Sequence, residues 1–172
     1  MGDLIRGNIY LIEEERLERT PALFLKEIKG KRGLIITRQP LEKIDDDGRL
    51  DSFPHQRLSL ATAAPGIISP HNISGISYKV SDFIAEITPG IIMLEGFEYL
   101  ATQTGFSSVL RLLQFIYDKI SGSNCIVLIS LNPLAFTQKE FHQIKKETVR
   151  APESYIEQEM ELEQVGMLKA RP

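Results

Sequence analysis

The chain of 172 residues has 20 basic and 23 acidic residues, a formal net charge of −3 and an apolar fraction of 42%. Without an excess of cations it gains little from counterion release, so we expect no binding to nucleic acid. No apolar run approaches the ~20 residues of a membrane-spanning helix, and the sequence starts without a signal pattern. These features predict a cytoplasmic protein without membrane insertion, with one domain over residues 1–149 and a tail, helical in one interpretation, over residues 150–172.

The first part of the chain predicts two strands separated by a helix. Residues 8–12, NIYLI, are mainly apolar and predict a short first strand. Thr20 and Pro21 are typical of an N-cap and a first helical residue, and Gly30 indicates where this helix ends. Residues 33–38, GLIITR, then predict a second, buried strand.

The middle of the chain predicts an alternating strand and a long helix. Apolar and polar residues alternate over residues 57–62, RLSLAT, as they do in a half-buried strand. Ser69 and Pro70 repeat the pairing of N-cap and first-turn proline. Apolar residues spaced three or four apart then predict a helix that continues to about residue 86.

The most informative stretch is the apolar run at residues 91–94, Ile-Ile-Met-Leu, because it lacks the alternation of a strand with one wet face. A central strand covered by helices on both sides has this pattern. Residues 107–120 predict the next helix and residues 125–131 the last buried strand. Thr137 and Glu140 predict a capping box at the start of a final helix. Strand and helix in alternation predict a three-layer α/β fold with a mainly parallel sheet.

Polar residues at the ends of the predicted strands form the candidate site. Glu95 and Glu98 follow the central strand, and neighbouring strands end in Thr37, Arg38, Ser130 and Asn132. Parallel sheets bind ligands at this edge, so these residues predict a polar pocket in which an anionic ligand would meet Arg38. In the alternative interpretation Arg38 pairs with Glu95 as a buried latch. Two interpretations of Glu95 and Glu98 remain. Either they form a pair that binds a metal or acts as a general base, or Glu95 caps the next helical turn and Glu98 is solvated.

The sequence does not support a cysteine or serine nucleophile or a zinc site. The single cysteine, Cys125, lies inside an apolar run, and no serine lies in a G-x-S-x-G turn. The histidines lack the spacing of a zinc site. We therefore expect no enzyme activity, no metal and no cofactor.

Four stretches carry a family resemblance: GLIITR, IISPHNISGI, PGIIMLEGFEYLATQTGFSSVLRLLQFIYDKI and IVLISLNPLAF. Together they resemble an archaeal family known only as a domain of unknown function, DUF 835, over about residues 10–146. The resemblance implies a fold similar to the RecA and KaiC branch of P-loop ATPases. It places the strand ending at Glu95 where the magnesium-binding acidic strand stands, between the strands at 9–12 and 125–131. It implies no known activity.

The sequence departs from a P-loop ATPase between the first strand and the first helix. Such an enzyme needs G-x-x-x-x-G-K-[ST] there, so that backbone N–H groups can surround the phosphates. This chain has EEERLERTPALF, without glycine or a Lys-Thr pair, and its three consecutive glutamates would repel a triphosphate. Glu95 also stands where the usual residue is aspartate. The resemblance is therefore to a degenerate member without the phosphate-binding loop.

These observations predict a non-catalytic protein-interaction or regulatory module in the cytoplasm of an archaeal cell, acting through an unidentified protein partner. The alternative is a small-ligand or nucleotide sensor that binds at the carboxyl end of the sheet near Arg38 and Glu95. Residues 155–162 supply apolar anchors in a charged tail. This tail packs against the same chain, packs against a second copy in a homo-oligomer, or stays a mobile terminus.

Overall fold

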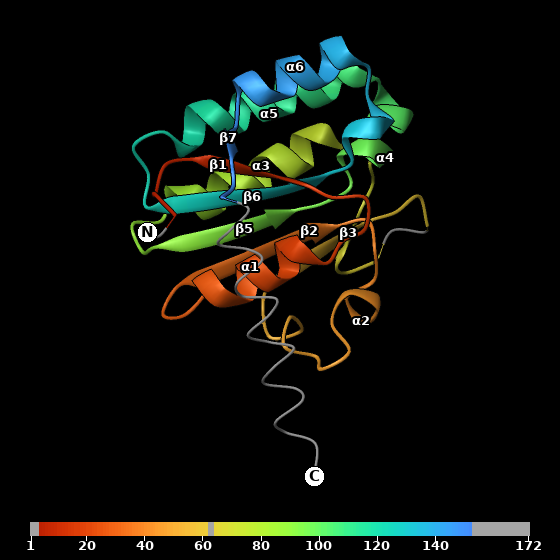
Figure 1. The fold of residues 1–172 in the computed structure, drawn as a ribbon. Helices are drawn as coiled ribbons and strands as arrows, with labels where there is room; N and C mark the ends of the chain where they lie inside the picture. The colour runs from red at the N-terminus through yellow and green to blue at the C-terminus, as the bar shows by residue number, and fades with distance from the viewer. Residues whose placement is uncertain (1–3, 62–63, 153–172) are drawn as a thin grey trace.

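The computed structural model describes residues 4–61 and 64–152, which form a parallel sheet with helices on both faces (Figure 1). The sheet has seven strands in the order β4-β3-β2-β5-β6-β1-β7, and each adjacent pair is parallel. In chain order the strands are β1 (Ile9–Glu13), β2 (Arg32–Thr37), β3 (His55–Leu58), β4 (Ile67–Ile68), β5 (Gly90–Leu94), β6 (Cys125–Leu131) and β7 (Val149–Arg150). The prediction of a three-layer α/β fold with a mainly parallel sheet is confirmed.

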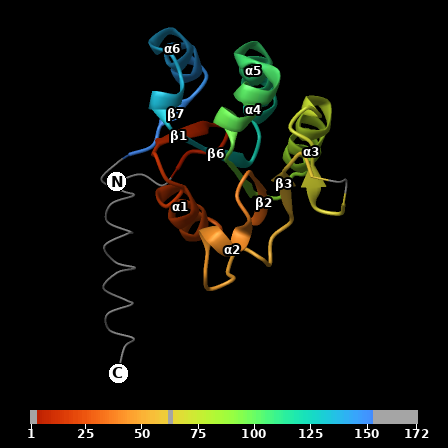
Figure 2. The same cartoon turned by 90° about the vertical axis from the view of Figure 1, so that its right-hand side faces the viewer.

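The helices divide between the two faces of the sheet, as the end-on view shows (Figure 2). One face is covered by α1 (Arg19–Glu27) and α2 (Leu41–Ile44). The other is covered by α3 (Ile73–Ala85), α4 (Phe97–Thr104), α5 (Phe106–Ile120) and α6 (Gln138–Lys146), and the short 3-10 helix η1 (Pro133–Ala135) follows β6. Within the described residues, no helix combines the length and the apolar character needed to cross a bilayer.

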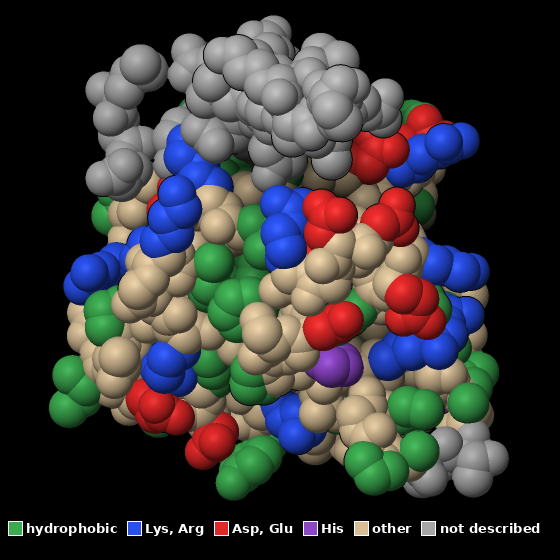
Figure 3. All heavy atoms as spheres, turned by 90° about the horizontal axis from the view of Figure 1, so that it is seen from below, with side chains coloured by type: hydrophobic (Ala, Val, Ile, Leu, Met, Phe, Trp, Pro, Cys, Tyr) green, Lys and Arg blue, Asp and Glu red, His purple; other side chains and the backbone are tan. Residues whose placement is uncertain are grey.

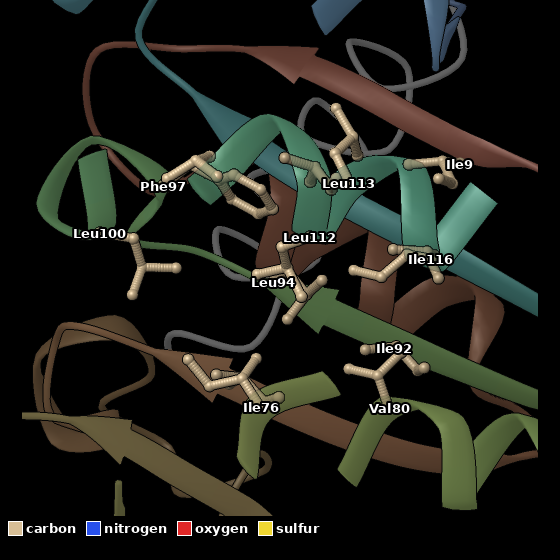
Figure 4. Packing of buried hydrophobic residues seen from close by; sticks show 14 of the residues in the cluster. Ile9, Ile76, Val80, Ile92, Leu94, Phe97, Leu100, Leu112, Leu113 and Ile116 are labelled. Carbon is tan, nitrogen blue, oxygen red and sulfur yellow. The ribbon is translucent and has the colours of Figure 1, made fainter. Parts of the chain in front are cut away.

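Strand β5 lies at the centre of the sheet, and all of its residues are buried. Ile91 and Met93 belong to the apolar cluster on the α1 face, whereas Ile92 and Leu94 belong to the cluster on the other face. Figure 4 shows Ile92 close to Val80 of α3. Each such side chain contributes ~1.5–3 kcal/mol through burial. The expectation that this strand is covered on both sides is confirmed.

The neighbours of β5 differ in part from those expected. Strand β6 pairs with β5 as predicted, but β2 takes its other side, and β1 pairs with β6 instead. The predicted contact of β5 with β1 is therefore wrong. The seven residues of β6 are all buried, and this strand contributes apolar side chains to both faces, so it is fitted to a position between two other strands.

The strand predicted over residues 57–62 is shorter and begins earlier than expected. Strand β3 ends at Leu58, and Leu60 is 57% exposed although the alternation placed it with Leu58 on the buried face. On the side of β3 away from β2 lies the two-residue β4, so little ladder is present there to extend the strand. The hydroxyl of Ser59 accepts from the N–H of Ala61 (3.1 Å) and stabilises a turn at this point.

The helix predicted from Ser69 and Pro70 begins three residues later. Residues 67–68 form β4, and the N-cap of α3 is Asn72, whose side-chain oxygen accepts from the N–H of Gly75 (2.9 Å). A side chain at Gly75 would collide with the Asn72 side chain, so glycine lets the cap approach closely. An asparagine two residues after Pro70 was therefore the stronger start signal.

The last helix has the predicted capping box, whereas the helices α2 and α4 were not predicted. Thr137 accepts from the N–H of Glu140 (3.2 Å), and the Glu140 carboxylate accepts from the N–H of Thr137 (2.9 Å). Helix α4 lies between Gly96 and Gly105, both with positive φ, in a stretch where one interpretation of the sequence expected a single helical turn capped by Glu95. The predicted helical tail, with the anchors at residues 155–162, lies outside the described residues.

Candidate functional site

Four strands end at one edge of the sheet, and a polar residue follows each of them. Because β1, β2, β5 and β6 are parallel and adjoin one another in the order β2-β5-β6-β1, their carboxyl ends lie together. Glu14 follows β1, Arg38 follows β2, Glu95 follows β5 and Asn132 follows β6. Ligands of open parallel sheets bind at this edge, so it is the candidate site.

Glu14 forms the most extensive set of hydrogen bonds at this edge. Its carboxylate accepts from the backbone N–H groups of Glu18 (3.2 Å), Arg19 (2.8 Å) and Thr20 (3.3 Å) at the start of α1. It also accepts from the buried hydroxyls of Thr20 (2.6 Å) and Ser130 (2.7 Å). The Glu14 side chain therefore caps α1 and ties it to the end of β6.

This cap corrects the predicted start of α1. Thr20 was expected to be the N-cap, but the helix begins at Arg19, the N-cap position is Glu18, and its own side chain makes no capping bond. The orphan N–H groups of the first turn are satisfied by a carboxylate from the end of the preceding strand. A negative charge is favoured there because the helix dipole leaves partial positive charge at the N-terminus.

Glu95 joins the ends of β5 and β2. Its carboxylate accepts from the hydroxyl of Thr37 (2.7 Å) and from the backbone N–H of Arg38 (2.9 Å), and its own N–H donates to the carbonyl of Ile36 (2.9 Å). Thr37 is buried, so its hydroxyl needs this partner. The predicted latch between the Arg38 side chain and Glu95 is therefore wrong, because the backbone N–H of Arg38 makes the contact with Glu95.

The guanidinium of Arg38 points elsewhere. It lies over the ring of Tyr99, 4.3 Å from the ring centroid, in a cation–π contact. Arg38 was expected to lie centrally in an anion-binding pocket, whereas the cleft at this edge is lined by other residues. Sequence reasoning missed the position of Tyr99 on α4, because α4 itself was not predicted.

Glu98, on the first turn of α4, contacts the end of β6. Its carboxylate accepts a hydrogen bond from the backbone N–H of Asn132, and the Asn132 side chain accepts from the N–H of Leu134 (3.0 Å) to cap η1. Burial raises the pKa of the Glu98 carboxyl. The charge of Glu95 raises this pKa further, while the hydrogen bond from Asn132 opposes the rise.

A cleft of about 280 Å³ opens between these groups. It is lined by Glu14, Glu15, Leu17, Gln39, Glu95, Glu98, Ser130, Asn132 and Ala135. Four of these side chains are glutamates, and the described lining contains no Lys, Arg or His. The cleft is therefore anionic, and it repels phosphate groups instead of attracting them.

The four glutamates do not form a metal centre in the part of the chain that the structure describes, because no group of three or more His, Cys, Asp or Glu residues there is arranged to hold an ion. Glu14 and Glu95 direct their oxygens at protein donors. The edge is thus held together by internal hydrogen bonds, with hydroxyl and amide donors already used.

The chain was compared with known protein families. A family model described as a protein of unknown function (DUF835) matches residues 14–148. The chain belongs to the DUF835 family. No curated protein matches it. The DUF835 match begins at Glu14 and includes every residue of the edge described above.

The site of this DUF835 chain brings together four of the five residues predicted to bind a ligand, though not around one cavity. Glu95, Glu98 and Asn132 line the cleft. Thr37 lies behind Glu95 as its hydrogen-bond donor, and only Arg38 turns away. Glu14 was missed as a site residue because it was read as part of a run of repelling charges. Its position directly after an apolar strand and before a helix was the available signal.

Proposed function

We propose that this DUF835 chain is a non-catalytic protein-interaction or regulatory module on a degenerate RecA-like fold. The observation that carries the proposal is the Glu14 carboxylate, which stands at the helix N-terminus where a P-loop protein would hold a phosphate. In this proposal the chain retains the fold and has replaced the nucleotide by one of its own side chains.

In this proposal, the parts of a P-loop correspond to parts of this chain. In a P-loop, a strand leads through a glycine-rich turn into a helix, the N–H groups cradle the phosphates, and a Ser or Thr hydroxyl binds the magnesium ion. In this chain β1 leads through residues 14–18 into α1. The N–H and the hydroxyl of Thr20 both donate to Glu14. The donors that would serve a nucleotide are used within the protein.

The charge at this edge also argues against nucleotide chemistry. Catalysis of phosphoryl transfer consists mainly of positioning and of neutralising charge, with a lysine and a magnesium ion next to the phosphates. The cleft beside Glu14 instead presents four glutamates. We therefore propose that the protein is not an ATPase or GTPase.

A role in binding other proteins is supported by aromatic residues on the helical face. Tyr78 of α3 is 71% exposed and Tyr117 of α5 is 47% exposed, and these two helices are in contact. Tyrosine is enriched at protein interfaces because it combines apolar area with a polar group. We propose that this binding takes place in the cytoplasm of an archaeal cell, with a protein partner or a second copy.

The alternative function, a small-ligand sensor, loses its main support. It required an anionic ligand to meet Arg38, but Arg38 lies over Tyr99 and the cleft carries carboxylates. A sensor at this edge would need a neutral or cationic ligand of a size suited to about 280 Å³.

Affinity capture and native mass spectrometry of the full chain test the proposal. We expect a protein that remains bound to the wild type and is lost from the double variant Tyr78→Ala/Tyr117→Ala. The matched control is Tyr99→Phe, which keeps the ring under Arg38 and should retain the partner. A co-purifying small molecule that Glu98→Gln releases, without any protein partner, would favour the sensor instead.

A further inference from the structure

A second hollow lies on the α1 face, near the amino ends of the strands. Its volume is about 370 Å³, and its lining is Leu4, Arg6, Lys26, Glu27, Lys29, Lys31 and Ile126. Four of these residues are basic and one is acidic. We call this hollow the basic groove. Leu4 and Ile126 are 7% and 2% exposed, so they form an apolar floor under a basic rim.

Glu27, the one acidic residue in the lining of the basic groove, forms an ion pair with a lysine of the same lining. Lys31 donates to the backbone carbonyl of Glu27 (2.7 Å), and its ammonium lies 3.9 Å from the Glu27 carboxylate. Arg6 and Lys29 are exposed on the rim. Arg6 and Lys29 therefore give the rim positive charge, whereas the whole chain has a formal net charge of −3. Figure 3 views the molecule from below, the side of α1 and α2, and shows Lys and Arg side chains together with acidic and hydrophobic ones on this face.

The described chain leaves the sheet on the same face as the groove. Ala151 is 3% exposed, and its N–H donates to the carbonyl of Leu11 (3.1 Å). Ala151 belongs to the apolar cluster that also contains Leu4 and Ile126. Tyr10 is in the same cluster, and its hydroxyl accepts a hydrogen bond from the N–H of Ile5 (2.8 Å). The apolar cluster therefore extends from the floor of the basic groove to Ala151.

The segment that follows has the complementary composition. Residues 153–163, ESYIEQEMELE, contain five glutamates and no Lys or Arg, and their apolar residues are Tyr155, Ile156, Met160 and Leu162. The segment must run along β1 to reach the basic groove at the amino ends of the strands. Strand β1 has five residues, and at ~3.3 Å per residue its length is roughly 17 Å. Eleven residues cover about that distance as a helix, at ~1.5 Å each, and more when extended.

We propose that residues 153–163 dock into the basic groove of the same chain. The glutamates face the cations on the rim, and the apolar side chains cover Leu4 and Ile126. The docked segment would exclude any other acidic partner from the groove, so it acts as a built-in competitor. This proposal does not depend on the role of Glu14 at the opposite edge.

Paramagnetic relaxation in the full chain tests this docking. A nitroxide is attached at Met160→Cys, and Cys125 does not compete because it is fully buried and burial raises the pKa of its thiol. In ¹⁵N-labelled protein at low salt, we expect the amide signals of Arg6 and Lys29 to lose most of their intensity. Raising the ionic strength from ~0.1 M to ~1 M shortens the screening length from about 10 to 3 Å and should restore much of it.

Charge variants in the labelled protein show whether the groove is responsible. Arg6→Glu/Lys29→Glu should restore the signals around residues 4–6 and 26–31. The matched control Lys139→Glu/Lys146→Glu changes the same charge on α6, on the opposite face, and should leave the broadening unchanged. Unchanged amide shifts in β5 verify that each variant is folded.

Three results would overturn the proposal. The first is the absence of broadening at Arg6 and Lys29, or broadening that Arg6→Glu/Lys29→Glu does not relieve. The second is broadening centred on Lys43 and Ile44, in the hollow on the other side of α1. The third is broadening that appears only when ¹⁵N protein without a label is mixed with labelled ¹⁴N protein, because it would assign the segment to a second copy.

Discussion

Thr20 gives both its backbone N–H and its buried hydroxyl to the carboxylate of Glu14, at 3.3 and 2.6 Å. The two residues join the end of β1 to the first turn of α1, and Ser130 adds a hydroxyl from β6. A helix N-terminus that elsewhere binds an anion thus has an anion supplied by its own chain.

Replacing Glu14 should therefore destabilise the fold. In Glu14→Ala, the N–H groups at the start of α1 and two buried hydroxyls lose their acceptor. We expect a loss of about 2–4 kcal/mol in the free energy of unfolding, measured by urea denaturation. Glu15→Ala, which removes the exposed neighbouring carboxylate, should change it by no more than about 0.5 kcal/mol. Equal effects of the two substitutions would contradict the capping role.

An added anion should partly replace the missing carboxylate. In Glu14→Ala the donors of α1 are unoccupied, so sulfate should raise its melting temperature more than it raises that of the wild type. Sodium chloride at matched ionic strength controls for general salt effects. The same sulfate-induced shift in both proteins would indicate that Glu14 does not occupy an anion position.

The uncharged Thr37 should contribute more to the stability of the fold than the charged side chain of Arg38. Thr37→Val removes a buried hydroxyl that donates to Glu95 and should cost about 1–3 kcal/mol. Arg38→Ala leaves the backbone N–H that binds Glu95 and removes only the contact with Tyr99, at a cost of about 0.5–1 kcal/mol. Urea denaturation ranks them. A larger loss from Arg38→Ala would mean that the guanidinium forms the latch.

Glu98 should make stability depend on pH. Because burial raises its pKa, the folded state binds the proton more tightly than the unfolded state, whose ordinary value is 4.5. Its contribution to stability is therefore largest at low pH, and it falls as the pH rises through the folded pKa. Glu98→Gln keeps an acceptor for Asn132 and should melt above the wild type at pH 7. This difference should shrink on acidification, and growth of the difference would contradict the assignment.

The fold could be predicted where burial dominates the sequence. Residues 91–94 and, apart from Ser130, residues 125–131 are apolar without alternation, and both are central strands covered on each face. The order of the strands was harder to predict, because the sequence of an apolar strand does not specify which strands it pairs with. Helix α4 escaped prediction since it depends on Gly96 and Gly105 at its ends and on the packing of Phe97 and Leu100.

The candidate site was predictable in place but not in detail. Parallel strands bring their carboxyl ends together, so Glu95, Glu98 and Asn132 were expected there, and the structure places them around one cleft. The direction of a long side chain such as Arg38 depends on a partner from another element, Tyr99. The role of Glu14 depends on donors from α1 and β6 that a linear pattern does not bring together.

Calorimetric titration of the full chain with ATP, ADP and GTP in the presence of Mg²⁺ tests the central claim most directly. The claim is that Glu14 fills the phosphate position and that the protein therefore binds no nucleotide. We expect no saturable heat at nucleotide concentrations up to the millimolar range. Saturable binding at micromolar concentration, abolished by Glu95→Ala, would contradict the account.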